Sequence, residues 1–135
     1  MQSLPDPPES MHALTLELHP VGLAVVRLPA DAAIPAWARG KFVSITRTPH
    51  ELSVVCDASD VPTDAWDSDP WNRIEVAGPL ALTETGILSN IAACLADAEI
   101  PIFTIATYDT DHILVRQRHA DGAAAALRSA GHTVN

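Results

Sequence analysis

The residues best suited to chemistry in this chain lie where a helical apolar pattern begins. Thr83 and Thr85 precede Gly86, Ile87 and Leu88. The first turn of a helix leaves backbone N–H groups without partners at the positive end of the helix dipole, so this segment could bind a carboxylate or a phosphate. Gly86 has no side chain and would let such a ligand approach the backbone. The alternative is an ordinary helix start, capped by the Thr85 hydroxyl, with no ligand.

A second polar group follows in a predicted turn that runs from Thr107 to Asp111. The carboxylates of Asp109 and Asp111 could receive an ammonium group or a basic side chain, and Tyr108 could cover such a ligand. An Asp-x-Asp pair also suits a hard cation, but no third carboxylate lies nearby in the sequence, so we expect no metal. A purely structural turn is the alternative, because Asp side chains often accept bonds from the backbone of their own turn.

The corresponding strand end in the first half of the chain carries Ser44, Thr46, Arg47 and Thr48. The Ser44 and Thr46 hydroxyls are candidate ligand contacts. Arg47 could hold a carboxylate through two hydrogen bonds, or it could be a solvated arginine beside a turn.

The other reactive side chains form no catalytic or metal-binding pattern. The six histidines are scattered, and none has the spacing of a metal-binding helical pair. Cys56 and Cys94 lie in apolar runs, which is typical of buried, reduced thiols. The chain has no nucleophile elbow, phosphate loop or Cys-x-x-Cys motif. We therefore expect no enzymatic activity, no cofactor and no metal.

Periodicity predicts the elements that position the candidate residues of the second half. Ile87, Ile91 and Leu95 recur on one face of a helix, and Pro101 prevents its continuation. Residues 102–107 form a β-branched run typical of a buried strand, and residues 112–115 resume as a strand after the turn. The result is a β-α-β-β unit.

The rest of the chain reads as short strands separated by turns. Strands are expected at 14–18, 23–28, 42–46, 52–56 and 73–77, a turn at 19–22, a short helix at 34–38 and a helix at 122–130 capped by Asp121. Residues 132–134 either add a last edge strand or fray. The two predicted hairpins align without a gap, residues 42–55 with residues 102–115, at an offset of 102 − 42 = 60. Such a period is too long for the common solenoids, so it indicates two copies of one module.

Charge and hydropathy exclude several classes of partner. The 135-residue chain has 17 acidic residues against 8 lysines and arginines, which gives a net charge of −9. Nucleic acids and anionic membranes select basic surfaces, so we expect neither as a partner. The N-terminus lacks the basic and apolar regions of a signal peptide, and no run approaches the roughly 20 apolar residues of a membrane span. We expect a cytoplasmic protein.

These motifs together resemble the ACT-domain family, whose small ferredoxin-like modules sense amino acids. The matching residues of the second half are Gly78-Pro79-Leu80, Thr85-Gly86-Ile87-Leu88, Ala96-Asp97-Ala98-Glu99-Ile100, Ile105-Ala106-Thr107-Tyr108-Asp109-Thr110-Asp111 and Ile113-Leu114-Val115. Residues 23–57 are similar to the first ACT unit of small stand-alone bacterial ACT-pair proteins. The resemblance extends to aspartate kinase regulatory domains and to the cytosolic arginine sensors of animals.

The resemblance implies an α+β fold of two ferredoxin-like βαββαβ modules packed as a tandem pair, with an amino acid bound at the interface between modules. It assigns the backbone of the ligand to Thr85, Gly86, Ile87 and Leu88. The remaining ligand contacts that it suggests on this chain are Thr107, Tyr108, Asp109, Asp111, Ser44 and Thr46.

We therefore predict a disordered tail at residues 1–11, an N-terminal ACT-like module at 12–76 and a C-terminal ACT domain at 77–135. The expected function is non-catalytic sensing of a free amino acid, by a homodimer or with an unidentified protein partner. Asp109 and Asp111 favour a basic ligand such as arginine or lysine. The alternative is a structural or dimerisation module that keeps the ACT fold and binds no ligand.

Overall fold

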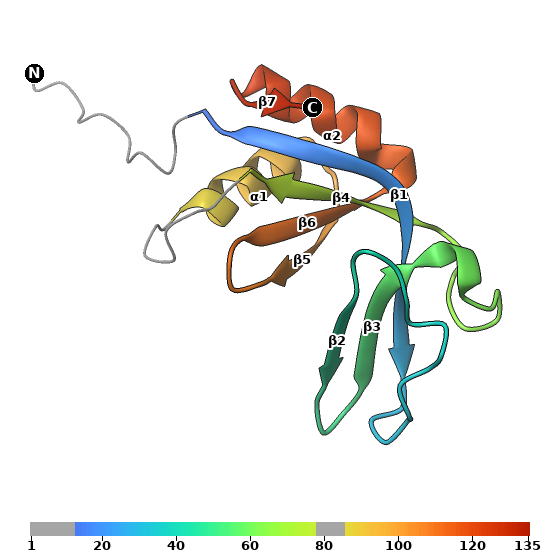
Figure 1. The fold of residues 1–135 in the computed structure, drawn as a ribbon. Coiled ribbons are helices and arrows are strands. Elements are labelled where there is room, and N and C mark those ends of the chain that lie inside the picture. Colours follow the sequence, from blue (N-terminus) through green and yellow to red (C-terminus); the bar gives the residue numbers. More distant parts are fainter. Residues whose placement is uncertain (1–12, 78–85) are drawn as a thin grey trace, which may run out of the picture.

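The strands of this protein form one strongly curled sheet. A computed structural model describes residues 13–77 and 86–135, and within them the sheet has seven strands, ordered β2-β3-β1-β4-β6-β5, with β7 pairing β1 (Figure 1). The elements are β1 (Thr15–Leu28), β2 (Ser44–Arg47), β3 (Leu52–Asp57), β4 (Trp71–Val76), α1 (Ile87–Asp97), β5 (Ile102–Ala106), β6 (Asp111–Arg116), α2 (Ala120–Ser129) and β7 (Thr133–Val134), with short 3-10 turns at Ala58–Asp60 and Gln117–His119. The α+β class predicted from the sequence is confirmed. The predicted tail and Thr85 lie outside the described residues.

The sheet bends into two arms that share β1 (Figure 1). The helical arm contains the first half of β1 with β4, β5, β6, β7 and both helices. The open arm contains the second half of β1 with β2 and β3. Each arm holds one of the two predicted hairpins, β5–β6 and β2–β3. In the helical arm, β4, α1, β5, β6, α2 and β7 follow one another in βαββαβ order, and the first half of β1 lies between β7 and β4.

β1 corrects one expectation from the sequence. Two strands with a turn at 19–22 were expected there, but β1 is continuous, and its register with β4 shifts between His19 and Leu23. Strand pairing on both sides of the shift keeps the chain extended, so the turn-forming residues make a bulge instead of reversing the chain. The Asn72 side chain, which is buried, donates to the carbonyls of Pro20 and Val21 at 3.2 and 3.3 Å. This satisfies the backbone at the bend.

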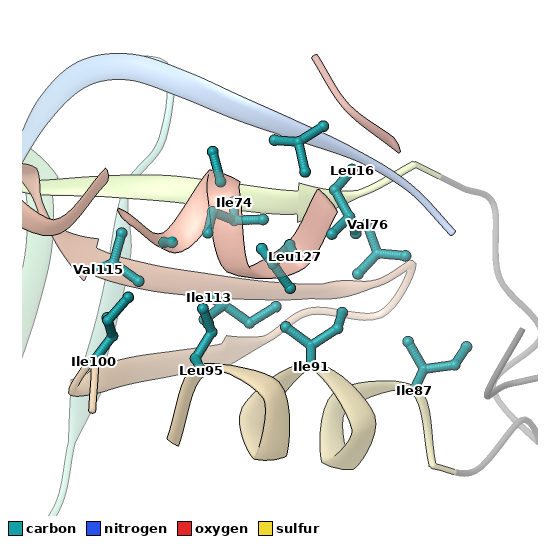
Figure 2. Packing of buried hydrophobic residues seen from close by; sticks show 13 residues of the cluster. Leu16, Ile74, Val76, Ile87, Ile91, Leu95, Ile100, Ile113, Val115 and Leu127 are labelled. Atoms are coloured by element: carbon teal, nitrogen blue, oxygen red, sulfur yellow. The ribbon is translucent and has the colours of Figure 1, made fainter. Parts of the chain in front are cut away.

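The main hydrophobic core lies between the helices and the sheet of the helical arm (Figure 2). Ile87, Ile91 and Leu95 point from α1 toward the strands, so the predicted helical stripe is confirmed. α2 contributes Leu127, which is fully buried. α2 begins one residue before Asp121, which lies in its first turn; the N-cap position belongs to His119, and the expected Asp121 cap is wrong.

The open arm is covered by turns instead of a helix. The short helix expected at 34–38 is absent, and Trp37 packs from this segment against a core that includes Val54 and Cys56. Pro35 can start a helix, but the segment continues for too few residues to offset the cost of forming the first turn. A single turn remains, with the Ala38 N–H bonded to the Pro35 carbonyl at 3.1 Å.

A third cluster lies on the face of the sheet that is turned away from the helices. This inner face buries Leu23 and Val55 of the open arm together with Trp71 and Leu114 of the helical arm, and Phe42 packs against them. Residues of both arms therefore meet in one apolar cluster across the bend.

Candidate functional site

The start of α1 and the β5–β6 turn lie at the same end of the helical arm. β4 and β5 both run antiparallel to β6, so they are parallel to each other, and α1 connects them. The start of such a crossover helix lies at the carboxyl ends of the two strands. The Thr110 hydroxyl donates to the Val76 carbonyl at 3.3 Å, which ties the turn to the end of β4. We call this region the sheet-end site.

At the sheet-end site, α1 offers backbone groups rather than side chains. Gly86 is the N-cap, with a φ of 87° and no side-chain hydrogen bond to the cap. A side chain at this φ would be strained, which explains why glycine suits the position. Ile87 is buried in the main core and Leu88 is half-buried against it, so the backbone N–H groups are the polar atoms that these residues can offer a ligand.

The β5–β6 turn presents side chains to solvent. Tyr108 is 82% exposed, Asp109 is exposed and Asp111 is half-buried at the start of β6. Within the described residues, neither carboxylate has a hydrogen-bond or ion-pair partner. Thr107 is committed to the turn, because both its N–H and its hydroxyl donate to the Thr110 carbonyl, at 2.9 and 3.0 Å.

Ser44 and Thr46 lie elsewhere, on β2 of the open arm. They line a shallow hollow of about 360 Å³ between the open arm and β5. The hollow reaches Ala106, the residue before Thr107, but Gly86 and Leu88 are not among its lining residues. The structure therefore brings the predicted residues together in two groups, one at the sheet end and one between the arms.

A third feature, which the sequence did not predict, is a pocket at the bend of the inner face. It measures about 260 Å³ and is lined by His19, Val21, Leu23, Lys41, Phe42, Asp57 and Arg73. We call it the bend pocket. The alternation R-x-E at 73–75 lies in a predicted strand, but His19 was assigned to the expected turn at 19–22, so the sequence did not show that Glu17, His19, Arg73 and Glu75 share a face.

Arg73 is the centre of the polar cluster beside the bend pocket. Its Nη1 donates to the Glu75 Oε1 at 2.6 Å and lies 3.1 Å from the His112 Nδ1. The His19 Nε2 lies 3.1 Å from the same Glu75 oxygen. The Arg73 guanidinium also lies 4.5 Å from the centroid of the Phe42 ring, within range of a cation–π contact.

The cluster shifts two pKa values. Burial raises the pKa of the Glu75 carboxyl, but the hydrogen bond and positive charge of Arg73 outweigh this, and the pKa lies below its usual value. Burial lowers the pKa of His112, and the positive charge of Arg73 lowers it further. At neutral pH, Glu75 is therefore ionised and His112 is neutral.

Two other groups of reactive side chains have structural explanations. Ligand atoms of Glu17, His19 and Glu75 lie within 4.8 Å of one another, as a metal site would require, but Arg73 already neutralises Glu75. Cys56 and Cys94 are free, and burial raises the pKa of both thiols, with a smaller contribution from neighbouring acidic groups. In the described part of the chain, no helix is both long and apolar enough to cross a membrane.

Comparison with known proteins identifies the fold. A family model described as an ACT domain matches residues 68–129. The solved structure of an Agrobacterium tumefaciens protein is 40% identical, covers 92% of this chain and 93% of its own, and superimposes with a TM-score of 0.83. The chain belongs to the ACT-domain family. A second model, described as an N-terminal domain, matches residues 22–64 of this ACT-domain chain.

Two named proteins are similar to this chain. The cytosolic arginine sensor for mTORC1 subunit 1, from Pongo abelii and Homo sapiens, is 30% identical over 118 residues, which are 80% of this chain and 36% of the sensor. The chain thus spans about a third of the length of the curated relatives it matches. The regulatory subunit of aspartate kinase from Thermus thermophilus is 12% identical, covers 87% of this chain and 94% of its own, and has a TM-score of 0.55, so it shares the fold alone.

Proposed function

We propose that this ACT-domain protein is a non-catalytic regulatory module that binds a free amino acid at the sheet-end site. The observation that carries the proposal is that the N-cap of α1, Gly86, lies at the same end of the helical arm as the carboxylates of the exposed Asp109 and the half-buried Asp111. N–H groups at a helix start suit the carboxylate of the ligand, and the carboxylates suit its ammonium group. An amino acid carries both charges.

The ligand class follows from the charges of the β5–β6 turn. Asp109 and Asp111 have no partner among the described residues, so a basic side chain could pair with one of them while the other holds the ammonium group. Arginine and lysine are therefore the expected ligands. The similarity to a cytosolic arginine sensor supports both this ligand class and a cytoplasmic location.

A thermal-shift screen of the common amino acids at millimolar concentration tests the proposal. A ligand at about 100 times its dissociation constant should stabilise the protein by about 2.7 kcal/mol, which corresponds to several degrees for a domain of this size. We expect arginine or lysine to raise the melting temperature, and a sodium chloride control of equal ionic strength to leave it unchanged.

Asparagine substitutions locate the binding. The double variant Asp109→Asn and Asp111→Asn should lose the response to the basic amino acid and keep the melting temperature of the free protein, because both side chains lie outside the core. Asp64, an exposed acid of the open arm, offers a control: Asp64→Asn should respond like the natural chain. A response to aspartate or leucine alone would contradict the basic ligand class.

One observation favours a second function, a dimerisation module without a ligand. β2 and β5 end the main path of the sheet, so each has an edge whose backbone groups are open to pairing with another chain. Ile45 of β2 is also 38% exposed. If no amino acid shifts the melting temperature while light scattering shows a stable dimer, this second function replaces the first. A homodimer is compatible with both.

A further inference from the structure

The bend pocket combines an apolar wall with unequal numbers of cations and anions. Val21, Leu23 and Phe42 supply the apolar surface, while Lys41, Arg73 and His19 bring donors to the same hollow. Asp57 is its one acidic lining residue. The pocket lies at the bend of the inner face, where the two arms meet, and it shares no lining residue with the sheet-end site.

Lys41 is the lining residue of the bend pocket that has no structural role among the described residues. It is the only lysine of the chain, it is exposed, and no hydrogen bond or ion pair joins it to any residue of 13–77 or 86–135. Most other cations of the inner face have such partners: Arg73 contacts Glu75, and Arg116 contacts Asp67 at 2.9 Å. A solitary ammonium group at the rim of a concave apolar pocket is suited to an anionic ligand.

Arg73 and His19 extend the binding surface from the rim into the pocket. The hydrogen bonds of Arg73 to Glu75 and His112 use Nη1, so Nε and Nη2 remain available as donors, and Arg73 lines the pocket. Phe42 stacks on the guanidinium and Glu75 holds it by a 2.6 Å bond. The donor groups are therefore fixed in place before a ligand arrives, which reduces the entropy lost on binding.

We propose that the bend pocket binds a small monocarboxylate with an apolar body. The carboxylate lies between Lys41, Arg73 and His19, and the apolar body lies on Val21, Leu23 and Phe42. A hollow of about 260 Å³ admits a molecule the size of an amino acid and is too small for a nucleotide.

Asp57 refines the chemical class of the ligand. Its Oδ1 accepts from the Ser59 N–H at 2.9 Å, and the backbone and side-chain hydrogen bonds from Ser59 lower the pKa of this carboxyl. Asp57 is thus a fixed negative charge at the pocket, so it disfavours a dicarboxylate and favours an ammonium group on the ligand. Apolar amino acids and simple carboxylic acids share the required chemistry, and Asp57 distinguishes them.

Titration calorimetry with four probes tests the proposal: 4-methylpentanoate, leucine, leucinamide and succinate. We expect saturable binding of 4-methylpentanoate and leucine at millimolar concentration, no binding of leucinamide, which lacks the carboxylate, and at least about ten-fold weaker binding of succinate, because charge-assisted hydrogen bonds are individually strong. Equal binding of leucinamide and leucine would overturn the proposal, as would the absence of binding by both carboxylates.

Two variants of equal charge locate the binding. Lys41→Gln should weaken the binding of 4-methylpentanoate at least about ten-fold. Arg39→Gln removes the same charge two residues away, from an exposed ion pair with Asp60, and should leave the affinity unchanged. Equal effects of the two variants would show attraction by net charge alone and would overturn the site. Asp57→Asn keeps an acceptor for the Ser59 N–H. If the ligand is an amino acid, this variant should weaken the binding of leucine and leave the binding of 4-methylpentanoate unchanged.

Nuclear magnetic resonance gives a second, independent location. Because Lys41 is the only lysine, reductive methylation with a ¹³C label gives one side-chain signal besides that of the N-terminal amine. That signal should move with the same dissociation constant as the calorimetric titration, and a stationary signal under saturating ligand would overturn the proposal. The Asp109→Asn and Asp111→Asn double variant should bind 4-methylpentanoate normally, so the bend pocket and the sheet-end site succeed or fail separately.

Discussion

The helical arm and the open arm cover their strands with different structures. Each must bury one face of a short antiparallel sheet. The helical arm does so with two helices: α1 places a periodic row of large side chains on the strands, and α2 contributes Leu127 together with buried alanines. The open arm uses irregular segments, from which Trp37 and Trp66 pack against its core. A few aromatic side chains can replace a helix as the cover of a sheet, because each buries a large apolar area.

The two arms should differ in how much stability they lose when a substitution creates a cavity in the core. Leu95 of α1 and Leu52 of β3 are both fully buried, so Leu95→Ala and Leu52→Ala remove the same atoms. Each should cost about 2–5 kcal/mol of the free energy of unfolding. The cost should be larger for Leu95→Ala in the helical arm, because turns can relax into a cavity more readily than a packed helix. Urea denaturation measures both values.

The shape of the unfolding curve sharpens this comparison. The arms share β1 and the inner-face cluster, so both variants should unfold in a single transition with an unchanged dependence on urea. A larger loss for Leu52→Ala would contradict the expected stiffness of the helical arm. A separate early transition in either variant would show that the arms unfold independently.

The next largest loss of stability is expected from glycine substitutions, made in one loop of each arm. Gly40 has a φ of 138°, and an added Cβ would lie 2.8 Å from the Asp57 Cβ. Gly131, after α2, has a φ of 99° and open space around the added atom. Gly131→Ala therefore carries backbone strain alone, about 1–3 kcal/mol, whereas Gly40→Ala adds a collision with β3. Thermal unfolding should show the lower melting temperature for Gly40→Ala; the reverse order would indicate that the covering segment shifts freely.

The sequence predicted regular elements well and their arrangement less well. The stripe of Ile87, Ile91 and Leu95 predicted α1 because burial on one helical face dictates that spacing. The turn expected at 19–22 became a bulge, because pairing with β3 and β4, which is not local in the sequence, decides whether turn residues reverse a chain. The division into modules near residue 77 stays a prediction, and β1 pairs with strands of both arms.

The candidate sites show the same limit. Gly86 and the β5–β6 turn could be found as motifs because each is a continuous segment. The bend pocket could not, since Lys41, Asp57 and Arg73 come from three segments that meet only when the sheet curls. Their types are ordinary for a surface, and their proximity depends on strand register, which a single sequence specifies weakly before the pairing is known.

The smallest predicted effect concerns His112, which lies on the inner face of the helical arm between the two candidate sites. Its ring faces Arg73 and Phe42, and its Nε2 lies 3.5 Å from the Thr107 hydroxyl of the β5–β6 turn. Burial, followed by the charge of Arg73, lowers the pKa of His112 below its ordinary value of 6.5, while Glu75 and Asp111 oppose the shift less strongly.

The sign of the pH effect follows from that shift. Below pH 6.5 the unfolded chain binds a proton at His112 that the folded chain resists, so stability contributed by this histidine is present above pH 6.5 and decreases as the pH falls toward the folded pKa. His112→Asn should therefore lose less of its free energy of unfolding between pH 7.5 and pH 5 than the natural chain, measured by urea denaturation. His50→Asn, at an exposed turn of the open arm, should keep the natural slope. Equal slopes in all three proteins would mean that the inner face accepts a charged His112, and the close contact with Arg73 would then have to open on protonation.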